Sequence, residues 1–199
     1  YVRPGLTWPL RAARFGPSIL PSGSIFSARG YAIIADPNSS LKLLGLGNSL
    51  AFDFLFKTML GRYEYPEFIV GVLKKLPLSR LSSDQVLMLS EAANSIFSMK
   101  KKVRSGHEVE HWFSMPSFLH MEGNRLKERI YRWCRKVQST SVQIEAQQSL
   151  VDSIGFAGYG FSDRDINEVI DLSSRGPTCI GDQVDESDDN NDSLVGAIV

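Results

Sequence analysis

The spacing of apolar residues changes character near residue 80 of this 199-residue chain. Before that point, short apolar runs at residues 18 to 26, 31 to 35 and 67 to 73 are separated by turn-forming residues and predict strands. Between the last two runs, apolar residues recur at roughly helical spacing: Leu41, Leu44, Phe52, Leu55 and Met59. This spacing predicts one helix, preceded by N-cap chemistry at residues 36 to 40 and ending near Gly61.

Two amphipathic stripes follow beyond Ser82, and they predict long helices. The first contains Val86, Leu89, Ala93, Ile96 and Val103, and the second contains Leu126, Ile130, Trp133, Val137, Ile144 and Val151. A connector with Gly106 and Pro116 separates them. Because each stripe needs a partner to bury it, we expect an antiparallel helical pair, with a last short helix over residues 163 to 172.

These elements predict an α+β fold in which a small mixed sheet packs on one helix over residues 1 to 80. A helical spacer or buttress follows over residues 81 to 172. Residues 173 to 199 are rich in Gly, Ser, Asp and Asn, which predicts a disordered acidic tail. The chain has no apolar run of bilayer length and no signal peptide, so we expect a cytoplasmic protein without a membrane partner.

The net charge of zero conceals a strong asymmetry along the chain. Residues 1 to 140 hold 20 Lys and Arg against 10 Asp and Glu, a net charge of +10, whereas residues 141 to 199 hold 2 against 12, a net charge of −10. A basic body suits a polyanionic partner, because Lys and Arg release the counterions condensed on phosphates. Nucleic acid is therefore the leading candidate, and a merely solvated basic surface is the alternative.

Two basic segments within the helical region allow two interpretations. One is the run from Lys100 to Arg104, and the other comprises Arg125, Lys127, Arg129, Arg132, Arg135 and Lys136. The first could simply complement a helix dipole and the second could be a solvated helix face. Either could instead contact phosphates.

The segment from His107 to His111 satisfies the H-E-x-x-H pattern, in which two zinc ligands share a helical face with a general base. Ser105-Gly106 and Pro116 restrict any helix there, and the extended pattern with a third histidine fails. We interpret the segment as a polar connector. A zinc-dependent hydrolase using His107, Glu108 and His111 is kept as an alternative.

Residues 156 to 160 match the F-x-G-x-G loop by which methyltransferases approach S-adenosylmethionine. A cofactor loop should open a large doubly wound domain, but only 39 residues follow it here. No two of the nine prolines are adjacent, so the chain also lacks the D/N/S-P-P-Y/F/W tetrapeptide of adenine-methylating enzymes. We therefore expect a helix-terminating turn at residues 156 to 160 and no methyl-transfer centre in this chain.

Several short segments occur in an order that carries a resemblance. They are residues 5 to 11 (GLTWPLR), 20 to 26 (LPSGSIF), Asn48-Ser49 followed by Phe52, 70 to 77 (VGVLKKLP), 110 to 116 (EHWFSMP) and 159 to 162 (YGFS). As an ordered set over roughly residues 1 to 172, they resemble the C-terminal target-recognition region of adenine-N6-specific DNA methyltransferases. The relevant kinds are type IIG restriction-modification enzymes and PglX-like enzymes of BREX phage defence.

The resemblance implies that this chain reads double-stranded DNA beside an upstream methyltransferase domain. That domain would hold S-adenosylmethionine and methylate a flipped adenine, and the chain itself would hold no cofactor, metal or catalytic residue. Because the chain opens at Tyr1 in the middle of a pattern, we expect it to be a fragment severed from this domain. The alternative is a noncatalytic specificity subunit like those of type I restriction systems, with a separate methylating partner.

The resemblance requires loops that present basic side chains to base edges and phosphates. We expect DNA contacts from Arg11, Arg14, Arg29, Lys74 and Lys75. Arg11 has a structural alternative, which is to pair with a carboxylate near Trp8. The aromatic residues of this region are expected in the core rather than stacked on bases: Trp8, Phe26, Phe52 and Phe54.

Overall fold

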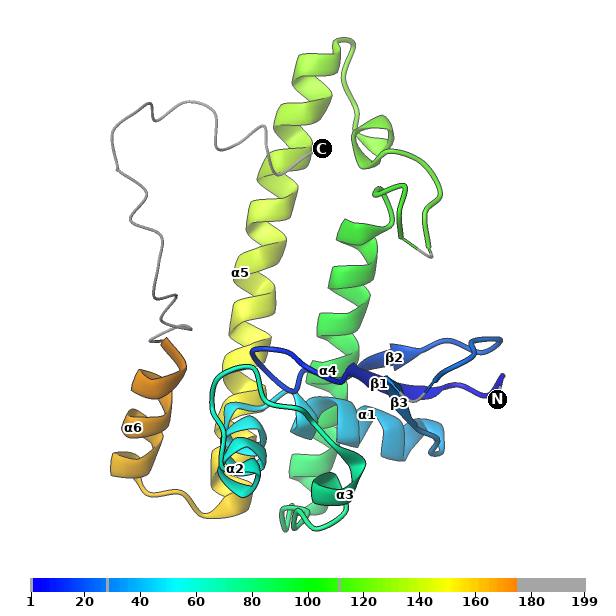
Figure 1. The fold of residues 1–199 in the computed structure, drawn as a ribbon. Helices are drawn as coiled ribbons and strands as arrows, with labels where there is room; N and C mark the ends of the chain where they lie inside the picture. The colour runs from blue at the N-terminus through cyan, green and yellow to red at the C-terminus, as the bar shows by residue number, and fades with distance from the viewer. Residues whose placement is uncertain (1, 28, 111, 175–199) are drawn as a thin grey trace, which may run out of the picture.

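The computed structural model describes residues 2–27, 29–110 and 112–174. Within them, a three-stranded antiparallel sheet combines with six α-helices and one 3-10 helix, which confirms the predicted α+β fold. Figure 1 shows the long helices α4 and α5 side by side, with the sheet and the shorter helices gathered at their lower ends. The elements are β1 (Gly5–Pro9), β2 (Ser18–Leu20), β3 (Gly30–Ile33), α1 (Pro37–Gly47), α2 (Leu50–Leu60), α3 (Val70–Leu73), α4 (Ser83–Arg104), η1 (Ser117–His120), α5 (Leu126–Tyr159) and α6 (Asp163–Ser174).

The sheet has the strand order β2-β1-β3, with β1 antiparallel to both neighbours. β1 was not among the predicted strands, although it is the central one. The strand predicted over residues 18 to 26 ends at Leu20, because Pro21 offers no N–H and the turn that follows places Gly23 at φ 87°. The strand predicted over residues 31 to 35 is observed as β3.

The strand predicted over residues 67 to 73 is wrong. Only Glu67 forms an isolated bridge, to Arg11, and the chain then turns into the short helix α3. Directly after the bridge, the Phe68 carbonyl accepts a hydrogen bond from the Trp8 indole N–H instead of a strand partner, and α3 begins two residues later. A short apolar run has no periodicity that separates a buried strand from a helical turn.

The single helix predicted between residues 41 and 59 is two helices, α1 and α2, bent by 74°. Ser49 breaks the run, because its hydroxyl accepts a hydrogen bond from the Phe52 N–H at 3.3 Å and caps α2. The outer boundaries agree with the prediction, since Asp36 caps α1 and Gly61 ends α2 in the left-handed conformation. Among the described residues no single helix is long and apolar enough to cross a membrane, and only α1 and α2 taken together meet that length and composition.

The predicted antiparallel helical pair is confirmed as α4 and α5 (Figure 1). Ser82 and Gln85 form a reciprocal capping box at the start of α4. α5 ends at Gly160 in the left-handed conformation, so the glycines of residues 156 to 160 belong to a helix end, as expected. The last helix, α6, also lies where it was predicted, whereas residues 175 to 199 of the acidic tail lie outside the described residues.

The main hydrophobic core contains residues from both sides of residue 80, the predicted boundary between the two regions. Its buried members come from both predicted regions: Trp8, Phe15, Leu46, Phe52, Phe56, Phe68, Leu76, Leu89, Ala92, Val151 and Ile154. Trp8 and Phe52 therefore lie in the core as expected, and Phe54 packs against Phe161 with ring centroids 6.0 Å apart. The sheet region and the lower halves of α4 and α5 share one core.

The contact of α5 with the α1–α2 break depends on a residue without a side chain. A Cβ at Gly155 would lie 2.7 Å from both Cβ and Oγ of Ser49, whereas one at Gly71 in α3 would meet nothing within 4 Å. We therefore expect Gly155→Ala to lower the free energy of unfolding by about 1–3 kcal/mol through overpacking. Gly71→Ala, the matched control, should change it by less than about 0.5 kcal/mol. Urea unfolding measures both, and equal stability of the two variants would contradict this account of the contact.

Candidate nucleic-acid interface

Arg11 is held by a carboxylate. Its guanidinium donates to Oε1 of Glu67 and forms an ion pair with it, although 60% of the Arg11 side chain is exposed. The antiparallel bridge between the two residues places them directly opposite each other. Arg11 therefore pairs with a carboxylate, as its structural alternative predicted, and Glu67 compensates part of its charge.

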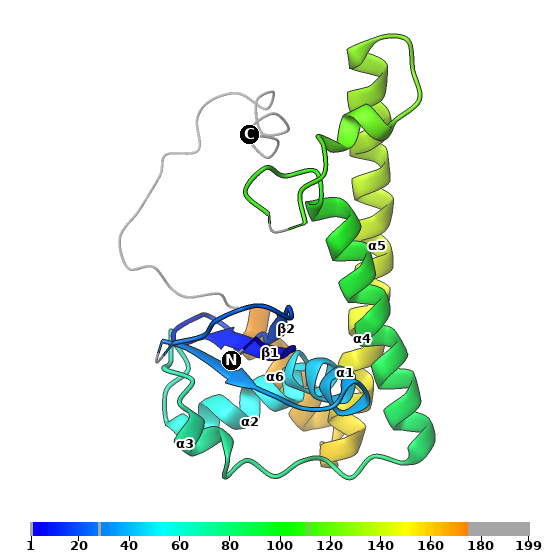
Figure 2. The same cartoon turned by 90° about the vertical axis from the view of Figure 1, so that its right-hand side faces the viewer.

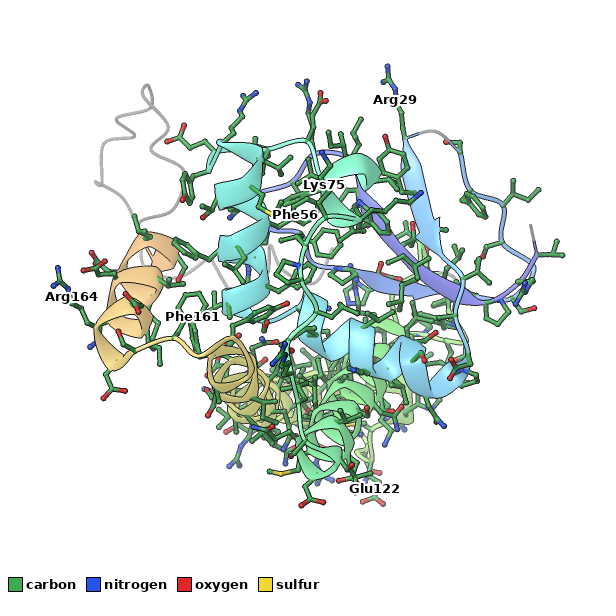
Figure 3. The ribbon with its side chains drawn as sticks, turned by 90° about the horizontal axis from the view of Figure 1, so that it is seen from below. Arg29, Phe56, Lys75, Glu122, Phe161 and Arg164 are labelled. Atoms are coloured by element: carbon green, nitrogen blue, oxygen red, sulfur yellow. The ribbon has the colours of Figure 1, made fainter. Side chains whose placement is uncertain are left out.

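Arg11 and Arg29 lie just beyond one end of the β1–β3 ladder, where Pro9 pairs with Gly30, and Lys74 and Lys75 directly follow α3. We call these four residues the sheet-end cations. Lys74 lines a cavity with Ala32 and Ile33 of β3, farther along that strand from Arg29. All four residues are exposed. Figure 3 shows Arg29 projecting from the start of β3 and Lys75 beside α3 on the same half of the molecule.

Arg14 lies apart from the sheet-end cations. Its guanidinium donates to the carbonyl of Asn48 at 3.3 Å, at the break between α1 and α2. The same carbonyl accepts a hydrogen bond at 3.0 Å from the side-chain amide of Gln148 on α5. Two of the five predicted DNA-contact residues thus lie at one end of the sheet, two follow α3, and Arg14 contacts the break between α1 and α2.

A second basic surface lies between the segment leading into β2 and helix α4. Figure 2 shows the backbones of β2 and α4 that flank it. It is an open groove of about 230 Å³, which we call the corner groove. Its upper wall carries Lys100, Lys101 and Arg104, and its lower wall is apolar, with Ala93 and Phe97 among its residues. These positions are three or four residues apart on α4 and so share one face of the helix.

The connector after α4 folds back over the top of this groove. The Trp112 ring packs edge-on against Phe97 at 5.6 Å, and the Lys101 ammonium lies 5.2 Å from its centroid. Arg104 pairs with Glu110 of the same connector at 2.8 Å. The basic run from Lys100 to Arg104 thus lies at the end of α4 and also lines a groove. The sequence signal for such a groove is the helical spacing of Lys100, Lys101 and Arg104 from Phe97.

The helix required for the zinc alternative does not form at residues 107 to 110. α4 ends at Arg104, and the residues after it form turns that bring Glu110 to Arg104. His111 lies outside the described residues. In the H-E-x-x-H pattern, two histidines bind zinc from one face of a helix and the Glu between them acts as the base. His107 and Glu108 lie in turns, so they do not have this helical arrangement. Within the described part of the chain, no group of three or more His, Cys, Asp or Glu side chains could hold a metal.

Asp152 of α5 connects the helical pair to the start of α2. Its Oδ1 accepts hydrogen bonds from the Leu50 N–H at 2.7 Å and from the Gln148 amide at 3.2 Å. Burial raises the pKa of Asp152 above the usual 3.8, although the Leu50 and Gln148 hydrogen bonds and the Arg14 charge act to lower it. Folding therefore favours the protonated form of this carboxyl group.

The raised pKa of Asp152 predicts how the stability of the fold changes with pH. Protonated Asp152 stabilises the folded chain fully below the ordinary aspartate pKa, and this stabilisation is lost as the pH rises through the raised folded pKa. Asp152→Asn keeps an oxygen acceptor for the Leu50 N–H but does not titrate. The stability of the natural chain relative to this variant should therefore fall as the pH rises from below 3.8 through the raised folded pKa. Urea unfolding across this range measures the difference, and a difference that grows with pH would refute the assignment.

No protein family model, no curated protein and no solved structure matches this chain. The resemblance that the sequence carries over residues 1 to 172 therefore stays a prediction. The function has to be argued from the basic surfaces of the chain itself, which are the sheet-end cations and the corner groove.

Proposed function

We propose that this chain is the DNA target-recognition portion of a site-specific adenine-N6 methyltransferase of restriction-modification or phage defence. The observation that supports DNA binding is the exposed group of sheet-end cations on secondary structure anchored in the core. Within the described residues, Arg11 is the only member of this group that takes part in an ion pair. Arg29, Lys74 and Lys75 can therefore neutralise phosphates without first breaking such a pair.

The elements that carry these cations are fixed to the aromatic core. The Trp8 indole N–H donates to the carbonyl of Phe68 at 2.9 Å, which ties β1 to the segment leading into α3. Lysines serve phosphates as point charges, whereas an arginine can also donate two parallel hydrogen bonds to a guanine edge. In this proposal Lys74 and Lys75 hold the backbone, and Arg29 is the candidate to enter a groove of the DNA.

The methyltransferase half of the proposal rests on the resemblance. The tetrapeptide that holds an extruded adenine is missing from the chain, so methylation requires an upstream domain that binds S-adenosylmethionine. In this arrangement the chain positions the duplex and the upstream domain performs the chemistry.

DNA binding should depend on salt and on the sheet-end cations. Arg29→Gln should weaken binding to a duplex and reduce the slope of log affinity against log salt by about 0.9, the value expected for one lost phosphate contact. A contact with a base edge would instead show as relaxed sequence preference. Fluorescence anisotropy with a labelled duplex at several salt concentrations measures both effects.

Arg164→Gln provides the matched control for loss of one arginine. Arg164 lies on α6, pairs with Glu168 at 3.1 Å and has 87% of its side chain exposed. Figure 3 shows it on the far side of α6 from the sheet. Equal effects of Arg29→Gln and Arg164→Gln would show that only net charge matters, and binding without salt dependence would remove the support for a phosphate contact.

The upstream domain has its own test, which needs no purified protein. Translation of the DNA that precedes the codon for Tyr1 should continue in frame into a domain with an N-P-P-Y-like motif. Such a domain binds S-adenosylmethionine and holds the flipped adenine in this family. A frame that encodes only a second recognition region would favour the type I-like specificity subunit instead.

A further inference from the structure

A second cavity lies higher on the helical pair, between α4, α5 and the 3-10 helix η1, and we call it the hairpin pocket. Its open volume is about 320 Å³, within the range of small-molecule sites. None of the residues that line it also lines the corner groove. In particular, Lys102 lines the hairpin pocket, whereas its neighbour Lys101 lines the groove.

Three basic side chains from three different elements line this pocket. They are Lys102 of α4, Lys136 of α5 and His120 of η1, and Gln143 adds an amide from α5. The described lining contains no aspartate or glutamate. The carboxylate of Glu122, just beyond η1, is 95% exposed and forms its 3.7 Å ion pair with Arg132 instead.

This arrangement has an electrostatic consequence. Lys102 and Lys136 both line this cavity, and their like charges repel each other. Among the ion pairs of the described residues, neither lysine takes part. An anion between them would replace that repulsion with two attractions. A phosphate group has enough oxygen acceptors to use both lysines, an imidazole N–H and an amide at once.

We infer that the hairpin pocket binds a phosphate group. The lining also contains the apolar side chains of Trp133, Met99 and Met121, so the space beside the phosphate suits a less polar group such as a sugar or a base. The phosphate could belong to a nucleic-acid backbone or to a small phosphorylated molecule. The inference does not depend on the proposed DNA function, because it concerns different residues.

Trp133 supplies a local reporter of binding. The chain has three tryptophans, so a ¹H–¹⁵N spectrum should show three indole N–H signals, and Trp133→Phe identifies the one from the pocket. Titration of the full chain with inorganic pyrophosphate should shift the Trp133 signal in a saturable manner. The signal of Trp8, which is buried in the core, should stay in place.

The double variant Lys102→Gln/Lys136→Gln should weaken this saturation by about tenfold or more, because it removes two charge-assisted contacts. Lys74→Gln/Lys75→Gln is the control with the same charge change, and it should leave the pyrophosphate titration unaltered while weakening DNA binding. Unchanged Trp8 signals establish that both variants are folded. No saturable shift of Trp133, or an equal titration in the Lys102→Gln/Lys136→Gln variant, overturns the inference.

A competition experiment identifies the source of the phosphate. If a DNA duplex displaces pyrophosphate from the site, the pocket receives a backbone phosphate. If the duplex leaves the pyrophosphate titration unchanged, the pocket receives a small phosphorylated ligand. Both results presuppose the phosphate site and differ only in what brings the phosphate to it.

Discussion

The aromatic cluster around Phe15 is the interaction on which the rest of this structure depends. The Phe15 ring lies 5.1 to 5.5 Å from the rings of Trp8, Phe52, Phe56 and Phe68, which belong to β1, α2 and the segment before α3. Figure 3 shows Phe56 on the side of α2 that lies toward α3. Burial of these rings supplies a large share of the apolar area that a small sheet region can remove from water. Without this cluster, three short strands would have no common core.

The polar contacts beside the cluster fix its geometry. The Phe15 N–H donates to Oδ1 of Asp53 at 2.7 Å, and Asp53 also pairs with Lys57 at 2.8 Å on the same helix. Asp53 is buried, so its charge is tolerated because both partners compensate it. A second buried carboxyl group, that of Asp152 on α5, accepts a hydrogen bond from the Leu50 N–H at the start of α2. The side chains of Asp53 and Asp152 connect the loop before β2, α2 and α5 into one unit.

This connection matters for function because it holds basic surfaces on a fixed frame. The sheet-end cations lie next to the ends of β1, β3 and α3. Residues of all three elements pack in the same core as the aromatic cluster. The corner groove and the hairpin pocket lie on α4 and α5, which meet the same core through Leu89 and Val151. The elements beside the sheet-end cations and the two long helices therefore share one hydrophobic core.

The amino-acid sequence by itself determined the α+β class, the long helices and their caps. Ser82, Gly61 and Gly160 act through local hydrogen bonds and backbone conformation, so a single sequence suffices to place them. Tertiary structure decided what local patterns leave open. Residues 67 to 73 form a bridge and a helix, with the Phe68 carbonyl bonded to the Trp8 indole of β1. The predicted helix is split at Ser49, where α5 presents Gly155. The same holds for the candidate sites. The sequence alone identified which residues are basic. Only the packing of segments distant along the chain brought Lys102 to the same cavity as Lys136 and paired Arg11 with Glu67.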